Sequence, residues 1–540
     1  MIFPLVVDRV LADRPLAEVG RSVITVVAPA GTHLVIGGHD PVSREDGYPI
    51  GVYTAAAREK EASSVEGDSR VLRWLRTQQP LRAAAFHPTE PLLVLGTGSY
   101  DGGYFFEGQL ALVNLVSGEI RYLLADDCSR EVRSLEWRDA HTLRLLVAPP
   151  DDWEDRAAWS EGHQVDITHP NWQAFPERSL AQKNVIGPRV PAPRHEPTPP
   201  MAGPQRDGRS GEIRSLTTLP DRDLLVTADH IVLERWSAAG ERRWSLPVGS
   251  DLRGGRLAVV IDDSSAWVEA LGHRLGEGGD FIRVDLAKGI ERERHTTPEP
   301  AALVSTSQGP LLVPMPAGHD ERVRSLFRHG PYALFRETSG LPCTCECPWD
   351  DDENCECQCA CPQCSIEGGD QEAWLTTIDG DPTGDPARLA FAAEERCRRL
   401  VPWSWEPGEI HCGGPGAWIT ETDLIMATVR HDGWVGVPKQ GFVTRRAIGK
   451  VSTGIPTWVF RINRTPTALD IDVASGTVLV ALRGGELISL DATTGALRAR
   501  GHVTVRGVPV IPTALTITGP GQFLLGTSDA RVLTCHLKPT

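Results

Sequence analysis

The 540-residue sequence has no long apolar run, no excess of basic residues and no secretory signal, and each absence excludes a class of protein. No apolar run reaches the roughly 18 residues that a transmembrane helix needs, so we expect no membrane partner. Basic residues number 55 against 71 acidic ones, and this formal net charge of −16 argues against a nucleic acid as the main partner. Residues 1–15 have no basic start, and Pro4 interrupts their apolar run. We therefore expect no secretory signal and a cytoplasmic protein with reduced thiols.

The motifs of the common enzyme classes are also missing. There is no His-Glu-x-x-His sequence of a zinc protease and no Gly-x-Ser-x-Gly sequence of a serine hydrolase. Gly449-Lys450 is not part of a phosphate-binding loop, because Thr444 stands where that motif requires its first glycine. We therefore predict no catalytic residues and no enzyme activity.

Helical periodicity is scarce, and residues 55–62, 153–161 and 387–400 are its best candidates. The rest of the chain consists of short β-rich runs divided by Gly, Pro, Asn, Asp and Ser. Strands at intervals of about 8–12 residues are typical of an all-β sandwich, barrel or propeller. The length favours the propeller, since repeated blades can extend a fold without enlarging any single core.

Repeated units support this prediction. Residues 81–124 and 466–500 each contain four strand-like runs in about 45 residues or fewer, as one propeller blade does. We predict one domain over residues 1–540, a single β-propeller of about eight four-stranded blades, with seven as the alternative. Weaker copies of the unit occupy residues 23–76, 132–172, 213–246, 256–294, 423–462 and 513–537.

The last of these units has only three strand-like runs. The N-terminal run of residues 4–11 can supply the fourth strand by pairing with residues 531–537. Such pairing would close the ring and remove two exposed strand edges. Two segments fall outside the repeat: residues 182–209 are rich in proline and predict a mobile loop, and residues 340–366 form a cysteine-rich insertion.

The cysteine-rich insertion holds eight of the 12 cysteines. In a reducing compartment such density favours a metal over disulfides, and Zn²⁺ accepts four thiolates tetrahedrally. We predict one or two zinc ions, while an iron–sulfur cluster, disulfides and a loop without ligand remain alternatives. The predicted ligands are Cys343, Cys345, Cys347, Cys355, Cys357, Cys359, Cys361 and Cys364.

A glycine-rich loop over residues 96–108 carries the aromatic residues Tyr100, Tyr104, Phe105 and Phe106. One interpretation is a surface that binds a protein partner. The other is a long hairpin whose aromatic side chains pack on a neighbouring blade. We predict the four aromatic residues as the partner-binding candidates.

Two segments resemble known repeats. Residues 83–103, AAAFHPTEPLLVLGTGSYDGG, resemble the first two strands of a bacterial WD repeat, and residues 485–499, GELISLDATTGALRA, resemble a quinoprotein repeat. Val113-Asn114 and Leu490-Asp491 stand where a WD repeat has its Trp-Asp pair. The resemblance implies a β-propeller fold; propellers of this kind also accompany MoxR-type ATPases in bacterial conflict systems.

We therefore predict a non-enzymatic scaffold that presents loops to a protein partner. The first alternative is a propeller hydrolase or quinoprotein-like oxidoreductase that uses the central channel. The second is a metal or redox sensor built on the cysteine-rich insertion, and the third is a component of a bacterial conflict system.

Overall fold

The computed structural model is all-β where it describes the chain, with only short 3₁₀ turns besides the strands. Most strands belong to antiparallel sheets of four. The described residues are 5–13, 17–19, 21–39, 47–54, 71–100, 106–125, 130–149, 155–193, 211–249, 252–272, 279–297, 301–306, 309–314, 332–336, 373–378, 390–391, 397–402, 411–420, 423–431, 438–447 and 456–538.

Three four-stranded sheets follow strand β1 (Leu5–Leu11), and we call them the N-terminal group. Within each sheet the main strands follow in chain order. The short strands β8 (Ser99–Tyr100) and β9 (Phe106–Glu107) form a separate hairpin between β7 and β10. The strands of the group are β2 (Arg21–Val27), β3 (His33–His39), β4 (Tyr48–Thr54) and β5 (Val71–Thr77); β6 (Leu81–Phe86), β7 (Leu92–Thr97), β10 (Leu110–Asn114) and β11 (Ile120–Tyr122); and β12 (Val132–Trp137), β13 (Thr142–Val147), β14 (Glu161–Thr168) and β15 (Arg189–Pro191).

Seven further sheets form what we call the C-terminal group. Five have four strands, because β1 joins the last sheet, and two have three strands among the described residues. The strands are β16 (Ile213–Thr218), β17 (Leu224–Ala228), β18 (Ile231–Trp236) and β19 (Arg242–Pro247); β20 (Leu252–Asp262), β21 (Ser265–Gly272), β22 (Asp280–Asp285) and β23 (Ile290–Thr296); β24 (Ala301–Thr306), β25 (Gly309–Pro314) and β28 (Ala390–Phe391); β26 (Tyr332–Arg336), β27 (Ala373–Ile378) and β29 (Cys397–Pro402); β30 (His411–Thr420), β31 (Asp423–His431), β32 (Pro438–Ala447) and β33 (Trp458–Ile462); β34 (Pro466–Asp472), β35 (Thr477–Leu482), β36 (Glu486–Asp491) and β37 (Leu497–His502); and β40 (Pro512–Gly519), β41 (Gln522–Thr527) and β42 (Val532–Leu537), with the small hairpin β38 (Thr504–Val505) and β39 (Val508–Pro509).

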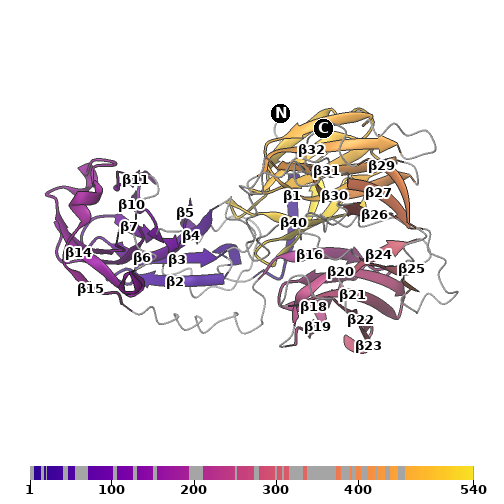
Figure 1. The fold of residues 1–540 in the computed structure, drawn as a ribbon, viewed down its shortest axis with the longest axis horizontal. Coiled ribbons are helices and arrows are strands. Elements are labelled where there is room, and N and C mark those ends of the chain that lie inside the picture. Colours follow the sequence, from indigo (N-terminus) through magenta and orange to yellow (C-terminus); the bar gives the residue numbers. More distant parts are fainter. Residues whose placement is uncertain are drawn as a thin grey trace, which may run out of the picture.

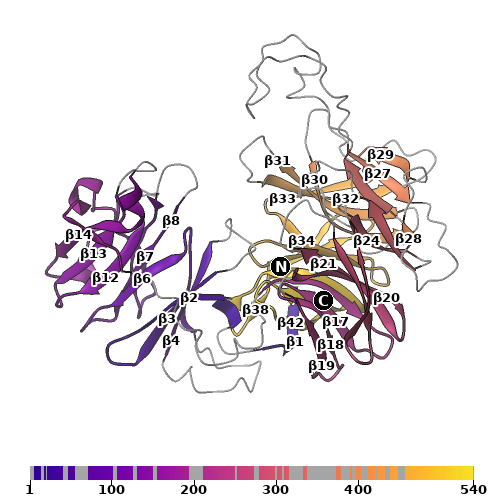
Figure 2. The same ribbon diagram turned by 60° about the horizontal axis from the view of Figure 1, so that its bottom comes forward.

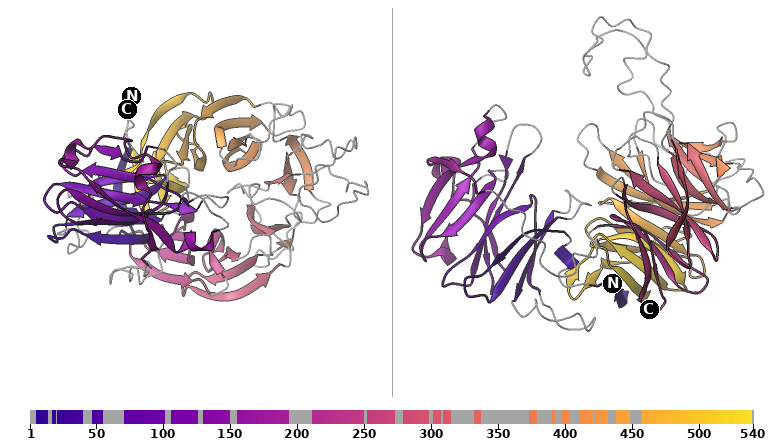
Figure 3. Two further views of the ribbon diagram at one scale, coloured as in Figure 1. Left: turned by 60° about the vertical axis from the view of Figure 1, so that its left-hand side comes forward. Right: turned by 90° about the horizontal axis from the view of Figure 1, so that it is seen from below.

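The two groups lie side by side (Figures 1 and 2). In the C-terminal group the sheets are arranged around a common centre (Figure 3, left). First strands of successive sheets touch: β34 contacts β30 and β40, and β40 contacts β16, which in turn contacts β20. The last sheet therefore adjoins the sheet that begins at Ile213, and the N-terminal group lies outside this sequence of neighbours.

Threonine hydroxyls join these first strands. Thr467 Oγ1 on β34 donates to the Pro512 carbonyl of β40 at 2.5 Å, and Thr513 Oγ1 on β40 donates to the Ile213 carbonyl of β16 at 2.8 Å. Thr516 Oγ1 donates to a further β16 carbonyl at 2.9 Å. The contact between β40 and β16 is thus fixed by hydrogen bonds between residues 300 positions apart.

The predicted pairing of the N-terminal run with the end of the chain is confirmed. β1 lies antiparallel to β42, with Leu5 opposite Leu537 and Leu11 opposite Val532. Across this pair, the ring nitrogen Nδ1 of His536 lies 2.9 Å from the carboxylate of Asp8. Strand β1 covers the edge that β42 would otherwise expose.

A β-bulge marks the start of many sheets. The first strand places one extra residue opposite its partner strand, and the residue after it is small in the sheets beginning at β6, β12, β16, β34 and β40. A bulge turns a side chain out of the regular alternation, so this residue can reach the neighbouring sheet. The extra residues of these five sheets are Arg82, Arg133, Arg214, Thr467 and Thr513.

Tryptophan side chains connect two pairs of neighbouring sheets through hydrogen bonds of the same kind. Trp458 on β33 donates its indole N–H to the Ala492 carbonyl at 3.1 Å, in the turn between β36 and β37. In the equivalent turn after β22, Trp244 donates to the Leu286 carbonyl at 2.9 Å. Gly495 closes the first turn with φ +71°, and a Cβ there would lie 2.6 Å from the Trp458 ring. Glycine is therefore required both for the backbone conformation and for the docked ring.

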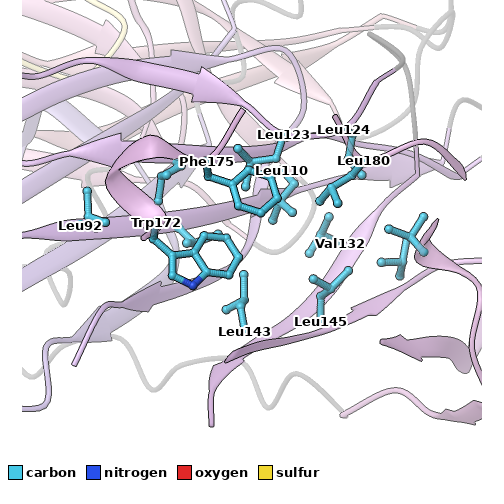
Figure 4. Packing of buried hydrophobic residues seen from close by; sticks show 14 residues of the cluster. Leu92, Leu110, Leu123, Leu124, Val132, Leu143, Leu145, Trp172, Phe175 and Leu180 are labelled. Carbon is cyan, nitrogen blue, oxygen red and sulfur yellow. The ribbon is translucent and has the colours of Figure 1, made fainter. Parts of the chain in front are cut away.

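The core is divided into layers between sheets. One layer lies between the β6–β11 and β12–β15 sheets and includes Leu92, Leu110, Leu143 and Leu145 (Figure 4). Trp172, which is buried, covers this layer and stacks on Phe175 at 4.7 Å between ring centroids. Alternate residues of β7 face the next layer, so the β6–β11 sheet is buried on both faces by its neighbours.

A buried ion network lies where β1 leads into the N-terminal group. Arg531 is 1% exposed, and its guanidinium donates to both carboxylate oxygens of Asp529, at 3.0 and 2.5 Å. Its Nη1 lies 3.8 Å from Asp13, whose other oxygen accepts from Arg506. Glu18, in the short turn that follows, adds negative charge and accepts a hydrogen bond from the Tyr53 hydroxyl at 3.0 Å.

Some predicted elements differ from the structure. The helix expected over residues 387–400 is replaced by β28 and the start of β29 where the chain is described. Of the helix expected over residues 153–161, the described part holds the 3₁₀ turn Arg156–Trp159 and the first residue of β14, and the helix expected over residues 55–62 lies outside the described residues. The predicted mobile loop begins too early, since residues 182–193 form a 3₁₀ turn and strand β15 paired with β14. Periodicity could not reveal this, because β15 is three residues long. Residues 194–209 and the insertion 340–366 lie outside the described residues. No helix in the described ranges has the length and apolar character to cross a bilayer.

Candidate interaction surface

The glycine-rich loop extends one edge of the β6–β11 sheet. In the β8–β9 hairpin, Tyr100 lies opposite Phe106 and Ser99 opposite Glu107. Two glycines let it pass close to the next sheet: a Cβ on Gly98 would lie 2.2 Å from the Glu131 side chain, and one on Gly108 would lie 2.6 Å from the Cα atom of Glu131. The hairpin is therefore held against the segment that leads into β12.

An aromatic cluster forms where this hairpin meets the next sheet. Ring centroids lie 5.2 Å apart between Tyr100 and Phe106, 4.7 Å between Tyr100 and Trp159, and 4.9 Å between Phe106 and Trp159. Phe106 is 6% exposed and rests against Ala148 and Ala158, whereas Trp159 is 54% exposed. The cluster thus has a buried ring, Phe106, that supports a largely exposed ring, Trp159, and the exposed ring is free to contact a partner.

Charged groups hold the cluster from below. The Arg133 guanidinium lies 4.6 Å from the centre of the Phe106 ring, a cation–π distance. Its Nε donates to Glu131 at 2.9 Å, and its Nη1 donates to the Ala158 carbonyl at 2.5 Å. Arg133 is the bulge residue of β12, so the bulge aims its side chain at the hairpin.

The turn that carries Trp159 is fixed by its own ion pairs. Asp155 accepts the backbone N–H of Ala157 at 2.9 Å as the N-cap of the 3₁₀ turn. Arg189 on β15 bonds Asp155 at 2.5 Å and Glu161 at 3.2 Å. The hydrogen bond from Arg189 lowers the pKa of Asp155 below its ordinary value. Three separate segments therefore determine where Trp159 stands.

The structure brings together two of the four predicted aromatic residues. Tyr100 and Phe106 share one cluster, and the buried Phe106 acts as its support. Tyr104 and Phe105 lie outside the described residues, as do the eight predicted cysteine ligands. The sequence interpretation missed Trp159 and Arg133. The repeated apolar–Arg–small pattern at the starts of β6, β12 and β16 was the available signal for Arg133.

In the described ranges, no group of three or more His, Cys, Asp or Glu side chains is placed to hold a metal ion. This finding does not bear on the cysteine-rich insertion.

Comparisons with known proteins give no family. No protein-family model matches the sequence, and no curated protein matches it. Among solved structures, the crystal structure of the computationally designed Ika8 protein aligns over 85% of this chain and 97% of its own, at 12% identity and a TM-score of 0.25. At that score the likeness assigns neither fold nor function.

Proposed function

We propose that the chain is a β-propeller scaffold that binds a protein partner through the aromatic cluster of Tyr100, Phe106 and Trp159. The single observation that carries this proposal is the exposed Trp159, held rigidly over buried aromatic and charged supports. Tryptophan and tyrosine in such a setting are the residue types that dominate binding energy at protein interfaces. A rigid ring also loses little conformational entropy on binding.

The propeller that we propose is a ring of seven blades formed by the C-terminal group alone, whereas the sequence prediction placed all of residues 1–540 in one ring. The contact of β40 with β16 and the threonine hydrogen bonds between them support ring closure at this point. Strand β1 completes the last blade. The N-terminal group would then project from the ring between β1 and β16 and carry the binding surface.

The partner can be tested with three variants. Purified wild type, Trp159→Ala and Ile186→Ser would be coupled to a resin, and proteins retained from a cell extract would be compared by mass spectrometry. Ile186 is a matched control, because it is equally exposed and lies on the same group of sheets. We expect one or more proteins to bind wild type and Ile186→Ser and to be lost with Trp159→Ala. Retention of the same proteins by all three would refute the proposed surface.

We also propose that the cysteine-rich insertion binds one or two Zn²⁺ ions in a cytoplasmic protein. Eight cysteines within 22 residues support this, since thiolates are preferred zinc ligands. Metal analysis of protein purified without added metal should find zinc, and Cys357→Ser with Cys359→Ser should lower it. Eight freely titrating thiols and no metal would refute this assignment.

A further inference from the structure

Arg130, two residues before β12, is a buried arginine whose charge has few partners among the described residues. Its side chain is 2% exposed. Nη2 donates to the Val185 carbonyl at 3.1 Å, whereas Nε and Nη1 are buried and have no hydrogen-bond partner among the described residues. Burial lowers the pKa of Arg130 to about 10, and no carboxylate of the described residues offsets this effect. Buried guanidinium groups are ordinarily paired, so this arrangement requires an explanation.

The adjacent carboxylate cannot supply the missing partner. Glu131 is already engaged by Arg133 at 2.9 Å and by Arg82 at 3.2 Å. Arg82 and Arg133 therefore share this one carboxylate, and in the described part of the chain none is left for Arg130. Among the described residues, the result is a local excess of positive charge in a buried region of a protein whose overall charge is −16.

We propose that Arg130 is the centre of a binding site for one small oxyanion, either a phosphate-type group or a carboxylate. A guanidinium binds both through charge-assisted hydrogen bonds. The unpaired Nε and Nη1 lie on different edges of the planar group, so one of them supplies the donor to the ion. The Val185 carbonyl occupies one nitrogen and orients the planar group. Because the side chain is buried, the ion enters during local opening of the segment around β12 and is then shielded from water.

This site is separate from the surface proposed for the protein partner. Arg130 bonds the segment at Val185, whereas Arg133 faces the aromatic cluster. An anion at Arg130 would stabilise the N-terminal group without covering Trp159. Loss of one site should therefore leave the other intact.

Thermal unfolding with added anions tests the proposal. We would compare wild type, Arg130→Met and the control Arg138→Met at constant ionic strength in chloride, phosphate, sulfate and acetate. Arg138 is a half-exposed arginine that follows the same strand and pairs with Glu136. We expect a saturable rise in Tm of about 3 °C for wild type and Arg138→Met at ten times the dissociation constant, and none for Arg130→Met.

The anions also identify the ligand class. A response to phosphate and sulfate alone assigns a tetrahedral oxyanion, and a response to acetate alone assigns a carboxylate; either supports the site. Equal responses in wild type and Arg130→Met would overturn it, because they would reflect general salt effects. Without anion, Arg130→Met should unfold at the same temperature as wild type or above it. If Arg130→Met does not fold, Arg130→Gln replaces it, and an undiminished phosphate response in that variant would equally refute the site.

Discussion

Replacing Arg531 by Met should destabilise the protein far more than replacing an exposed arginine. Arg531 is 1% exposed and donates to both oxygens of Asp529. Its removal leaves the buried carboxylate of Asp529 and the partly buried carboxylate of Asp13 with less positive charge to offset them. Breaking a buried pair in this way costs about 3–5 kcal/mol, roughly a thousandfold in the folding equilibrium.

The matched control is the exposed pair of Arg144 and Asp166, which has the same two-point geometry at 2.7 and 2.8 Å. These side chains are 30% and 43% exposed, so solvent screens them, and Arg144→Met should cost less than about 1 kcal/mol. The free energy of unfolding would be measured in urea by circular dichroism. The comparison isolates burial, because the chemistry of the two pairs is the same.

A double variant tests whether the Arg531 and Asp529 side chains act as a pair. Asp529→Asn with Arg531→Met should cost at least 2 kcal/mol less than the sum of the single variants, since neither charge is then left alone. A high salt concentration should change the contribution of this pair to the free energy of unfolding very little, because buried charges are weakly screened. If Arg531→Met costs no more than Arg144→Met, or if the two single effects simply add, the reasoning is wrong.

Three further predictions concern docking, pH and the chain ends. Trp458→Ala should lower the free energy of unfolding by about 3–5 kcal/mol in the same assay, since it removes a large buried ring and leaves the Ala492 carbonyl without its indole donor; a cost below 1 kcal/mol would show that the ring does not dock the two sheets. Because the pKa of Asp155 is lowered in the folded protein, its ionised form stabilises the folded state at pH values above the unfolded pKa of about 4. This stabilisation is lost as the pH falls through the folded pKa. Trp159 fluorescence, isolated by comparison with Trp159→Ala, should therefore change below about pH 4 in wild type and be constant in Asp155→Asn; identical profiles would contradict this. Deletion of residues 1–11 should expose the edge of β42 and cause aggregation in size-exclusion chromatography, so a monomeric truncated protein with unchanged Tm would count against the role of β1.

The sequence alone determined the local β structure. Alternating apolar runs followed by Gly or Pro predicted all four main strands of the sheets at residues 81–122 and 466–502, because strand periodicity and turn chemistry are local properties. The three-stranded last unit also predicted the pairing of β1 with β42, since an open edge requires a partner. The same rules failed for β15, which is too short to show a period.

Only the tertiary structure decided which sheets are neighbours. An alternating strand shows that a face is buried, but the pattern is the same whichever sheet covers it. The contact of β40 with β16 therefore could not be read from the chain, and neither could the meeting of Trp159 with Tyr100. The same holds for the buried charges: Arg531 and Arg130 look like ordinary surface arginines in the sequence. Their burial follows from which segments fold over them, and that is a property of the whole packed chain.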